Sequence, residues 1–526
     1  MTPFAIHRFR WASLLVAVSL SACFLVRKIT VDVVDHTRRT DSVMVKNPVK
    51  AHLVDGSTVV YPRGVLVQGN QLLGEGTWYD LTLGNPVSII KLTLDSVVGI
   101  ESFRTRIDGS ASFGVSLLID VGVVGVAVAF ACAADPKCFG SCPTYYSDSA
   151  GTPVLEAEGF SYSVAPLFES RDVDRLRGRP DERGVFRLEV RNEAFETHYI
   201  NHLELLEAKH APGEYIVPDQ DGNLLALTGQ GAPRSARDRA GREVTDLISA
   251  AEGQVYATSP SVMARVSEDD FEDYLEFNFG AVGPLQGDSV ALVLRLRNSL
   301  LNTVLLYDVM LGDPGARSLD WQAQHLSRVG PALELGAWYA REMGLTVEVW
   351  RGGRWVAAAR IKDTGPVAWK DVAVSLANPG GAELRVRLRH PADNWRIDRV
   401  ALAQGVRRPV MRTVPVSEVR GLRGGFEPDA YASILANDER YLQTQAGQAF
   451  VASWEVGPET PDQARTFLLA SQGYYIEWVR RGWIAAGRDT ATFRPSDAAL
   501  HKAIVRWRTV QDTLEQRFFA TRVPVR

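Results

Sequence analysis

One long apolar run divides this chain. Residues 111–146 read ASFGVSLLIDVGVVGVAVAFACAADPKCFGSCPTYY, and the part from 111 to 134 carries a single charge, Asp120. A run of that length can cross a bilayer as a helix. A short β-patterned region precedes it and a much longer one follows it. We therefore predict one apolar helix over 107–134, with a separate β unit on each side.

The N-terminus has the pattern of a bacterial lipoprotein signal peptide. Residues 7–10 are positively charged, and residues 11–20 form an apolar segment too short to span a bilayer. The sequence Leu-Ser-Ala-Cys at 20–23 resembles the lipobox, which the lipoprotein signal peptidase cuts. That resemblance implies that Cys23 becomes the first mature residue and carries the lipid. An ordinary secretory signal with a cysteine at this place is the alternative.

A lipid on Cys23 predicts a cell-envelope protein anchored to the membrane. Phe24 stands where an aspartate would retain a lipoprotein in the inner membrane, so we expect the outer membrane, with the body in the periplasm or at the cell surface. A spanning helix at 107–134 would then return residues 135–526 to the cytoplasm. It would also leave the arginines at 104 and 106 on the non-cytoplasmic side, against the positive-inside tendency. We favour a helix buried against protein and keep the membrane span as the alternative.

Three cysteines remain after lipidation, and an exported protein favours disulfides. We expect Cys138 and Cys142 to pair, because the glycine and serine between them permit a tight turn, while Cys132 stays buried and reduced. A metal site lacks a fourth ligand, and a redox pair would have two residues between its cysteines. A structural disulfide is therefore the preferred interpretation.

Alternation of apolar and polar residues predicts a mainly β, multi-domain protein. Five short strands suggest a small SH3-like barrel or meander, and later strands suggest a jelly-roll-like sandwich. Ser496 can cap a C-terminal helix whose apolar stripe, Leu500 to Phe518, should pack against a domain. The predicted units are a signal peptide (1–22), a tether (23–44), a small β-barrel (45–106), the apolar helix (107–134), a β-rich domain with the cysteine pair (135–285), a β-sandwich (286–405) and a mixed α/β region (406–526).

Short pieces of sequence between 191 and 246 are distinctive. They are Asn192-Glu193, Glu196-Thr197, Tyr199-Ile200, His210 to Gly213, Ala236 to Asp238 and Gly241-Arg242, and 394–398 reads Asn-Trp-Arg-Ile-Asp. The region resembles a β-rich part of bacterial proteins that also carry FG-GAP or tetratricopeptide repeats with an ASPIC/UnbV-type segment, although those repeats are absent from this chain. The cysteine unit at 138–145 is similar to that of uncharacterised envelope lipoproteins. Both resemblances imply an exported interaction protein and assign no catalytic residue.

Several tryptophans fall in or beside the predicted sandwich. Exposed aromatic rings of jelly rolls can stack on sugar rings, so Trp350, Trp355 and Trp395 are candidate ligand residues. The alternative is that these tryptophans fill the core. The full set is Trp321, Trp338, Trp350, Trp355, Trp369 and Trp395.

We predict no metal site and no cofactor. His198 and His202 are four residues apart but lack the glutamate of a zinc protease, and on a strand they would share a face. Residues 219–223 contain only a fragment of a calcium loop and fit a hairpin turn better. The acidic run at 268–273 is typical of a solvated face, with calcium attraction as the alternative.

No motif names a reaction. The chain has no Gly-x-Ser-x-Gly elbow, phosphate-binding loop or His-Glu-x-x-His. A formal net charge of −4 without a basic stripe excludes a typical nucleic-acid binder. We expect a non-enzymatic envelope protein that binds or scaffolds, with a glycan or an envelope protein as partner. The alternatives are an envelope hydrolase that acts on glycans through a carboxylate pair hidden in the β body, and a membrane-embedded assembly subunit.

Overall fold

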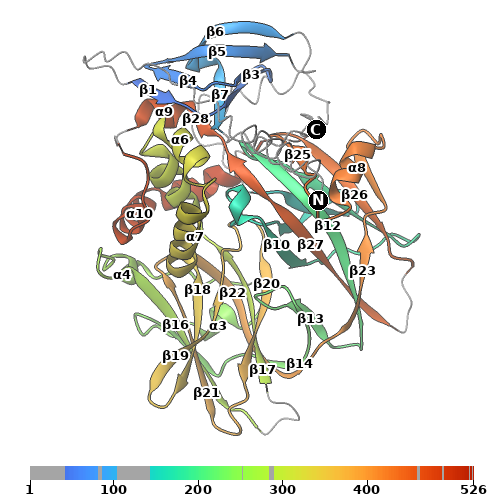
Figure 1. Cartoon of the computed structure of the whole chain (residues 1–526). Helices are drawn as coiled ribbons and strands as arrows, with labels where there is room; N and C mark the ends of the chain where they lie inside the picture. The colour runs from blue at the N-terminus through green and yellow to red at the C-terminus, as the bar shows by residue number, and fades with distance from the viewer. Residues whose placement is uncertain are drawn as a thin grey trace, which may run out of the picture. The chain divides into compact units, whose positions relative to one another are not determined.

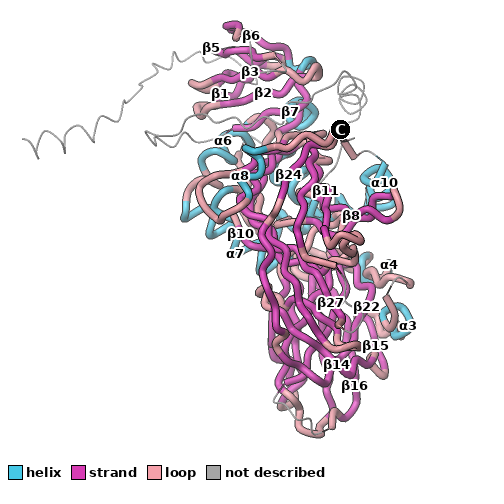
Figure 2. The backbone as a smooth tube through the Cα atoms, turned by 90° about the vertical axis from the view of Figure 1, so that its right-hand side faces the viewer, coloured by secondary structure: helices cyan, strands magenta, loops and turns pink. Residues whose placement is uncertain are grey.

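The computed structural model describes residues 42–80, 86–102, 142–251, 253–283, 289–458, 463–487, 491–520, 522–523 and 525. The signal peptide, Cys23, the helix predicted at 107–134 and Cys138 therefore lie outside the described residues. Within the described part, five antiparallel sheets and several helices form a mainly β, multi-domain protein, which confirms the predicted fold class (Figures 1 and 2). None of the helices in this part is long and apolar enough to span a membrane.

The N-terminal unit is one antiparallel sheet with the order β1-β4-β5-β3-β2-β7-β28, and β6 pairs with β5. Four of the five strands predicted in this region, at 49–54, 57–61, 64–67 and 88–92, are present. The fifth, predicted at 78–83, overlaps the observed strand only at 78–79, and the strand at 97–102 was not predicted. The C-terminal strand β28 adds to the edge of the sheet, which local patterning could not show. The elements are β1 (Ser42–Val45), β2 (Val49–Leu53), β3 (Thr58–Tyr61), β4 (Val65–Gln68), β5 (Gln71–Tyr79), β6 (Val87–Thr93), η1 (Leu94–Ser96), β7 (Val97–Ser102) and β28 (Val479–Arg480).

A first sandwich packs the sheet β13-β14-β22-β17-β20 on the sheet β15-β16-β21-β18-β19. In β17, Leu292 and Leu294 face this core while Ala291 and Val293 face a second cluster. Burial of both faces explains the continuous apolar sequence. The strands are β13 (Tyr215–Pro218), β14 (Leu224–Gly231), β15 (Ser235–Asp238), β16 (Glu272–Ala281), β17 (Ser289–Asn298), β18 (Leu345–Arg351), β19 (Arg354–Ile361), β20 (Lys370–Ala377), β21 (Glu383–Pro391) and β22 (Trp395–Arg407).

The predicted sandwich boundary at 285/286 falls inside this domain. Strands β13 to β16 come from residues 215–281, yet they pair with strands from the second half of the sandwich. The domain begins at Tyr215, the first residue of β13, which is about 70 residues earlier than the predicted boundary. Turn signals mark strands but do not show with which strand each one pairs.

A second sandwich joins two distant parts of the chain. The sheet β10-β27-β12-β23, with β25 on β12, packs on β24-β26-β11-β8-β9 around Phe186, Trp454 and Phe467. Half of its strands come from the predicted mixed α/β region. They are β8 (Thr144–Ser149), β9 (Thr152–Glu158), β10 (Ser170–Arg175), β11 (Val185–Arg191), β12 (Glu196–His210), β23 (Val410–Pro415), β24 (Glu418–Gly421), β25 (Leu442–Thr444), β26 (Ala449–Glu455) and β27 (Ala464–Glu477).

Helices inserted between β17 and β18 pack with the C-terminal helix and the N-terminal sheet in one apolar cluster. The predicted stripe on that C-terminal helix is buried, from Leu500 to Phe518, and the backbone N–H of Ala499 donates to Ser496 Oγ, as expected of a cap. The helices are η2 (Pro166–Phe168), α3 (Thr245–Ile248), α4 (Pro260–Met263), α5 (Leu301–Val304), the π-helical η3 (Leu305–Gly312), α6 (Arg317–Gln324), α7 (Val329–Met343), α8 (Pro428–Ile434), α9 (Arg481–Ala486) and α10 (Asp497–Ala520).

Candidate functional site

A cavity of about 240 Å³ lies where six separate stretches of chain meet. The stretches are the 161–164 loop with η2, the start of β12, the end of β27, α5 with η3, α7, and the 362–366 loop after β19. Most lining side chains are aliphatic or aromatic. A concave, mostly apolar space with a few polar groups is the usual form of a small-ligand site.

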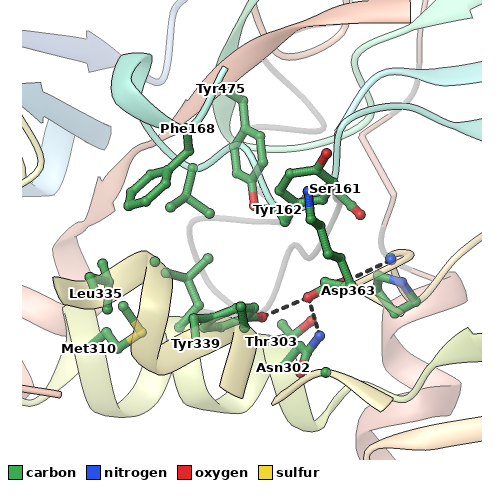
Figure 3. A pocket seen from close by; sticks show the side chains of 18 of the residues that line it. Ser161, Tyr162, Phe168, Asn302, Thr303, Met310, Leu335, Tyr339, Asp363 and Tyr475 are labelled. Carbon is green, nitrogen blue, oxygen red and sulfur yellow. Dashed lines mark hydrogen bonds between the residues drawn. The ribbon is translucent and has the colours of Figure 1, made fainter. Parts of the chain in front are cut away.

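Aromatic side chains form much of the cavity wall. Tyr162, Phe168, Tyr339 and Tyr475 surround the space in Figure 3, and Tyr307 also lines it. Gly336 allows α7 to approach η2, because a Cβ at this position would meet Phe168 Cε1 at 2.8 Å. This part of the wall therefore depends on close contact between η2 and α7, which are more than 160 residues apart in the sequence.

Asp363 supplies one polar end of the cavity. Its Oδ2 accepts hydrogen bonds from Tyr339 Oη at 2.7 Å and from Asn302 Nδ2, and its Oδ1 accepts one from the Gly365 N–H at 2.8 Å (Figure 3). Burial raises the pKa of the Asp363 carboxyl despite these donors. The side chain is held in one orientation before any ligand arrives.

A second polar group is built from two buried glutamates. Glu196 on β12 stands directly opposite Glu477 on β27, and the two strands lie side by side in Figure 1. His198 Nε2 lies 2.6 Å from Glu196 Oε1. Glu477 accepts from Arg480 Nη2 at 2.6 Å and from Tyr307 Oη at 2.9 Å. Glu196 and Tyr307 line the cavity, so this polar cluster reaches its wall.

Both buried glutamates keep a proton to higher pH than an exposed glutamate does. Burial raises the pKa of Glu196 to about 7 and that of Glu477 to about 8, while burial lowers the pKa of His198 to about 3. Because the pKa of Glu477 is the higher of the two, Glu196 is the first of the pair to lose its proton as pH rises.

The candidate tryptophans separate into two groups. Trp350 and Trp355 pair across β18 and β19 as an edge-to-face couple 5.2 Å apart, and Trp350 is 36% exposed. Arg385 lies 5.0 Å from the Trp350 ring centroid, so part of that face is covered. Trp395 is fully buried in the first sandwich. Its predicted place on a ligand surface is wrong, because its apolar ring fills the core.

The segment 394–398 is structural. Asn394 Nδ2 and Trp395 Nε1 both donate to the backbone oxygen of Met343, at 2.8 and 3.3 Å. Asp398 accepts from Arg295 at 2.7 Å. These contacts attach the end of α7 to the sandwich, and they place no side chain of this segment in the cavity lining.

The predicted histidine pair does not share a face. The partners of His198 and His202 on β27 are Tyr475 and Gln472, three residues apart, because the register shifts between Ile200 and His202. Side chains alternate along a strand, so the bulge turns His202 away from His198. Among the described residues, no group of three or more His, Cys, Asp or Glu side chains is arranged to hold a metal ion.

The predicted disulfide cannot be followed, because Cys138 lies outside the described residues. Cys142 is described, is buried and forms no disulfide within that part of the chain. Burial raises the pKa of its thiol well above the usual value. The thiol is therefore held in its unreactive form.

Sequence reasoning did not single out Asp363, Glu477 or Asn302, and it quoted Glu196 only within a resemblance. Asp363 stands in the loop after β19, and each glutamate stands at a polar position of a strand. Such a position normally faces solvent, and only the strand pairing shows that these two glutamates face inward. No local signal could have brought six distant stretches together.

Comparisons with known proteins add little. No family model matches the chain, and no curated protein matches it. Among solved structures, the cycloalternan-forming enzyme from Listeria monocytogenes has a TM-score of 0.18 at 10% identity over 70% of this chain and 30% of its own. BuGH86 in complex with neoagarooctaose has 0.15 at 10%, over 44% and 35%. An exo-β-1,3-galactanase from Phanerochaete chrysosporium has 0.16 at 9%, over 70% and 82%.

The matched region spans only about a third of the first two of these proteins. Similarity at this level defines no shared fold and supports no argument about function.

Proposed function

We propose that this chain is a lipid-anchored envelope protein that binds one small, largely apolar ligand in the cavity beside Asp363 and Glu196. The cavity itself carries the proposal: aromatic and aliphatic walls enclose a space of about 240 Å³ and meet two carboxyl groups. Apolar walls supply affinity through burial, and a few oriented polar groups supply selectivity. The lipobox-like sequence ending at Cys23 supports the proposed location in the cell envelope.

The size of the cavity limits the ligand. An engineered cavity of about 150 Å³ holds benzene, and typical drug-sized sites begin near 300 Å³. The present cavity falls between these sizes. It suits a molecule of about ten non-hydrogen atoms, such as one ring with a short side chain.

The test uses three probes of one shape: 2-phenylethanol, 2-phenylethylamine and phenylacetate, titrated calorimetrically into the full mature chain. Leu335→Trp fills the cavity, since Leu335 lines it and is 4% exposed. Leu333→Trp, at an exposed position of the same helix α7, is the matched control. Ala340→Leu is a milder filling variant if Leu335→Trp does not fold.

We expect at least one probe to bind the wild type and Leu333→Trp alike, and to bind the filled variant at least tenfold more weakly. Failure of all three probes to bind the folded wild type would contradict the proposal. Equal binding by the folded filled variant would contradict it too, because the probe would then occupy another place.

Hydrolysis of a glycan is the second candidate, and one observation favours it. Burial raises the pKa of Glu196 to about 7, as in a general acid, and this carboxyl lines the cavity. Its neighbour Glu477 stands directly opposite it on the paired strand, however, and directly opposed positions of a sheet have Cβ atoms about 4.5–5.5 Å apart, which leaves no room for a sugar between the two carboxyls. Asp363 is the other acid in the lining. Turnover of nitrophenyl glycosides by the wild type but not by Glu196→Gln would support hydrolysis; absence of turnover would remove it.

A further inference from the structure

We propose that the ligand of this cavity is a small organic ammonium ion with at least one N–H donor, a primary or secondary amine that carries an aromatic or aliphatic group. This inference rests on the proposed binding function and adds the ligand's chemical class. It follows from unpaired acceptors, charge and aromatic walls, each visible in the structure.

Two buried acceptors in the lining residues lack a hydrogen-bond donor among the described residues. They are Oε2 of Glu196 and Oδ1 of Asn302. The orientation of the Asn302 amide is fixed, because its Nδ2 donates to Asp363, which leaves Oδ1 at the other end. A buried acceptor without a donor is costly. A ligand with N–H groups would satisfy both atoms, whereas a carboxylate ligand would add further acceptors.

The charges near the cavity also favour a cation. Two acids, Glu196 and Asp363, line it, and Lys362 is the basic residue among the described lining side chains. Lys362 is exposed to solvent, and its ammonium lies over the ring of Tyr162. Arg480 is buried and pairs with Glu477 at 2.6 Å. An ammonium ion inside would therefore meet two acids in the lining itself.

The aromatic walls suit the same ligand. The ammonium of Lys362 already lies 5.4 Å from the ring centroid of Tyr162, a cation–π distance. Phe168, Tyr339 and Tyr475 face the same space (Figure 3). Rings with negative faces attract ammonium ions and also bury the ligand's apolar group.

Binding should displace a proton. Burial favours the protonated form of Glu196, whose pKa it raises to about 7, and an ammonium N–H can take that proton's place beside the carboxylate. The charged or titratable groups that act on Glu196 and Glu477 are His198, Arg480, Tyr307, Tyr475 and Cys142. Tyr339, Cys142 and Asp172 act on Asp363. None of the groups facing Glu196 except Arg480 carries a positive charge near neutral pH, so the incoming cation replaces the proton.

The experiment compares 2-phenylethylamine with its neutral isostere 2-phenylethanol at pH 6 and pH 8, in two buffers of different ionisation enthalpy. The amine is an ammonium ion at both pH values, as lysine is. We expect the amine to bind at least tenfold more tightly than the alcohol at pH 8, with proton release. Its affinity should rise several-fold from pH 6 to pH 8, and that of the alcohol should stay constant.

Glu196→Gln is the decisive variant, since it keeps the shape and removes the charge. It should lose most of the preference for the amine over the alcohol, whereas Leu333→Trp, at an exposed position, should keep that preference. If alcohol and amine bind the wild type equally, or if phenylacetate binds best, the ammonium inference is overturned and the binding function stands. If none of the probes binds, the binding function falls as well.

Discussion

Glu196 and Glu477 face each other directly across the antiparallel pair β12–β27, and both side chains are buried. Like charges at directly opposed positions of a sheet are destabilising. The structure accommodates them because one carboxyl keeps a proton and three side chains, His198, Arg480 and Tyr307, hydrogen-bond to the pair. A sheet that needed only stability would hold apolar residues at this place.

The first prediction is a loss of stability at mildly alkaline pH. Folding raises the pKa values of Glu196 and Glu477 to about 7 and 8 from a usual 4.5. The folded state therefore holds protons that the unfolded state has released, and stability falls as pH rises through this range. From pH 6.5 to 8.5 we expect the free energy of unfolding to drop by roughly 2 kcal/mol, measured by urea denaturation.

The pH range above 6.5 avoids the titration of the buried histidines. Below pH 6.5 the buried histidines His52 and His198, whose pKa values are lowered to about 4 and 3, act in the opposite sense. Asp174, raised to about 7, acts in the same sense as the glutamates. Glu196→Gln should therefore flatten the curve only in part, while the exposed Glu334→Gln should leave it unchanged. A wild-type curve without slope above pH 6.5 would contradict the raised pKa values of the two glutamates.

The second prediction concerns the turn that follows Asp363. Gly365 and Gly353 have the same φ of +79°, but a Cβ on Gly365 would lie 2.4 Å from the Glu158 carboxyl, and a Cβ on Gly353 meets nothing within 4 Å. Glu158 accepts hydrogen bonds from the backbone of Val367 and Ala368. Gly353→Ala should cost about 1 kcal/mol for the left-handed backbone, and Gly365→Ala roughly 2 kcal/mol more.

Thermal and urea unfolding of both glycine variants measure this difference in the free energy of unfolding. The cost of placing alanine at a φ of +79° is common to both variants and cancels in the comparison. We expect probe binding to weaken only in Gly365→Ala, because its turn positions Asp363. Equal losses of stability in the two variants would mean that the Glu158 contact does not constrain the turn.

The sequence supported local structure better than long-range structure. Alternation predicted four of the strands between 45 and 106, and helical spacing predicted the buried stripe of α10, because each pattern depends on neighbouring residues. The pairing of β12 with β27 joins positions about 250 to 280 residues apart, and no periodicity encodes that partner. For the same reason the sequence misplaced the boundary of the first sandwich. It also could not predict the one-residue bulge that turns His202 away from His198.

The candidate site was hidden for a related physical reason. Polar residues at alternating positions usually face water, so Glu196 and Glu477 resemble surface residues in the sequence. The sequence misled in the opposite direction for one tryptophan, which was predicted at the surface and is buried. Trp395 resembled a ligand residue by its neighbourhood, yet it fills the first core.

The third prediction tests the exposed tryptophan pair. Trp350 and Trp355 stand on the β18–β19 hairpin with Arg385 stacked against both. If this surface binds glycans, Trp350→Ala combined with Trp355→Ala should abolish retention of the protein on peptidoglycan sacculi and lower stability only modestly. Leu333→Trp serves as a binding-competent control. Wild-type protein that does not sediment with sacculi would remove this surface as a peptidoglycan site.

The fourth prediction concerns the anchor. Cys23 lies outside the described residues, and its lipidation stays a prediction from the lipobox-like sequence. Cells that express the wild type should incorporate labelled palmitate into the chain, and Cys23→Ser should not. Label retained by Cys23→Ser, or absent from the wild type, would contradict the anchor without affecting the cavity.

The most direct test of the central claim is a crystal structure of the mature chain with 4-bromophenethylamine, in which anomalous scattering locates the bromine. We predict one strong bromine peak among Phe168, Tyr339 and Tyr475, with the amine nitrogen within hydrogen-bond distance of Glu196 or Asn302. An unoccupied cavity in crystals soaked well above the affinity measured in solution, or a peak only at the surface, would contradict the account.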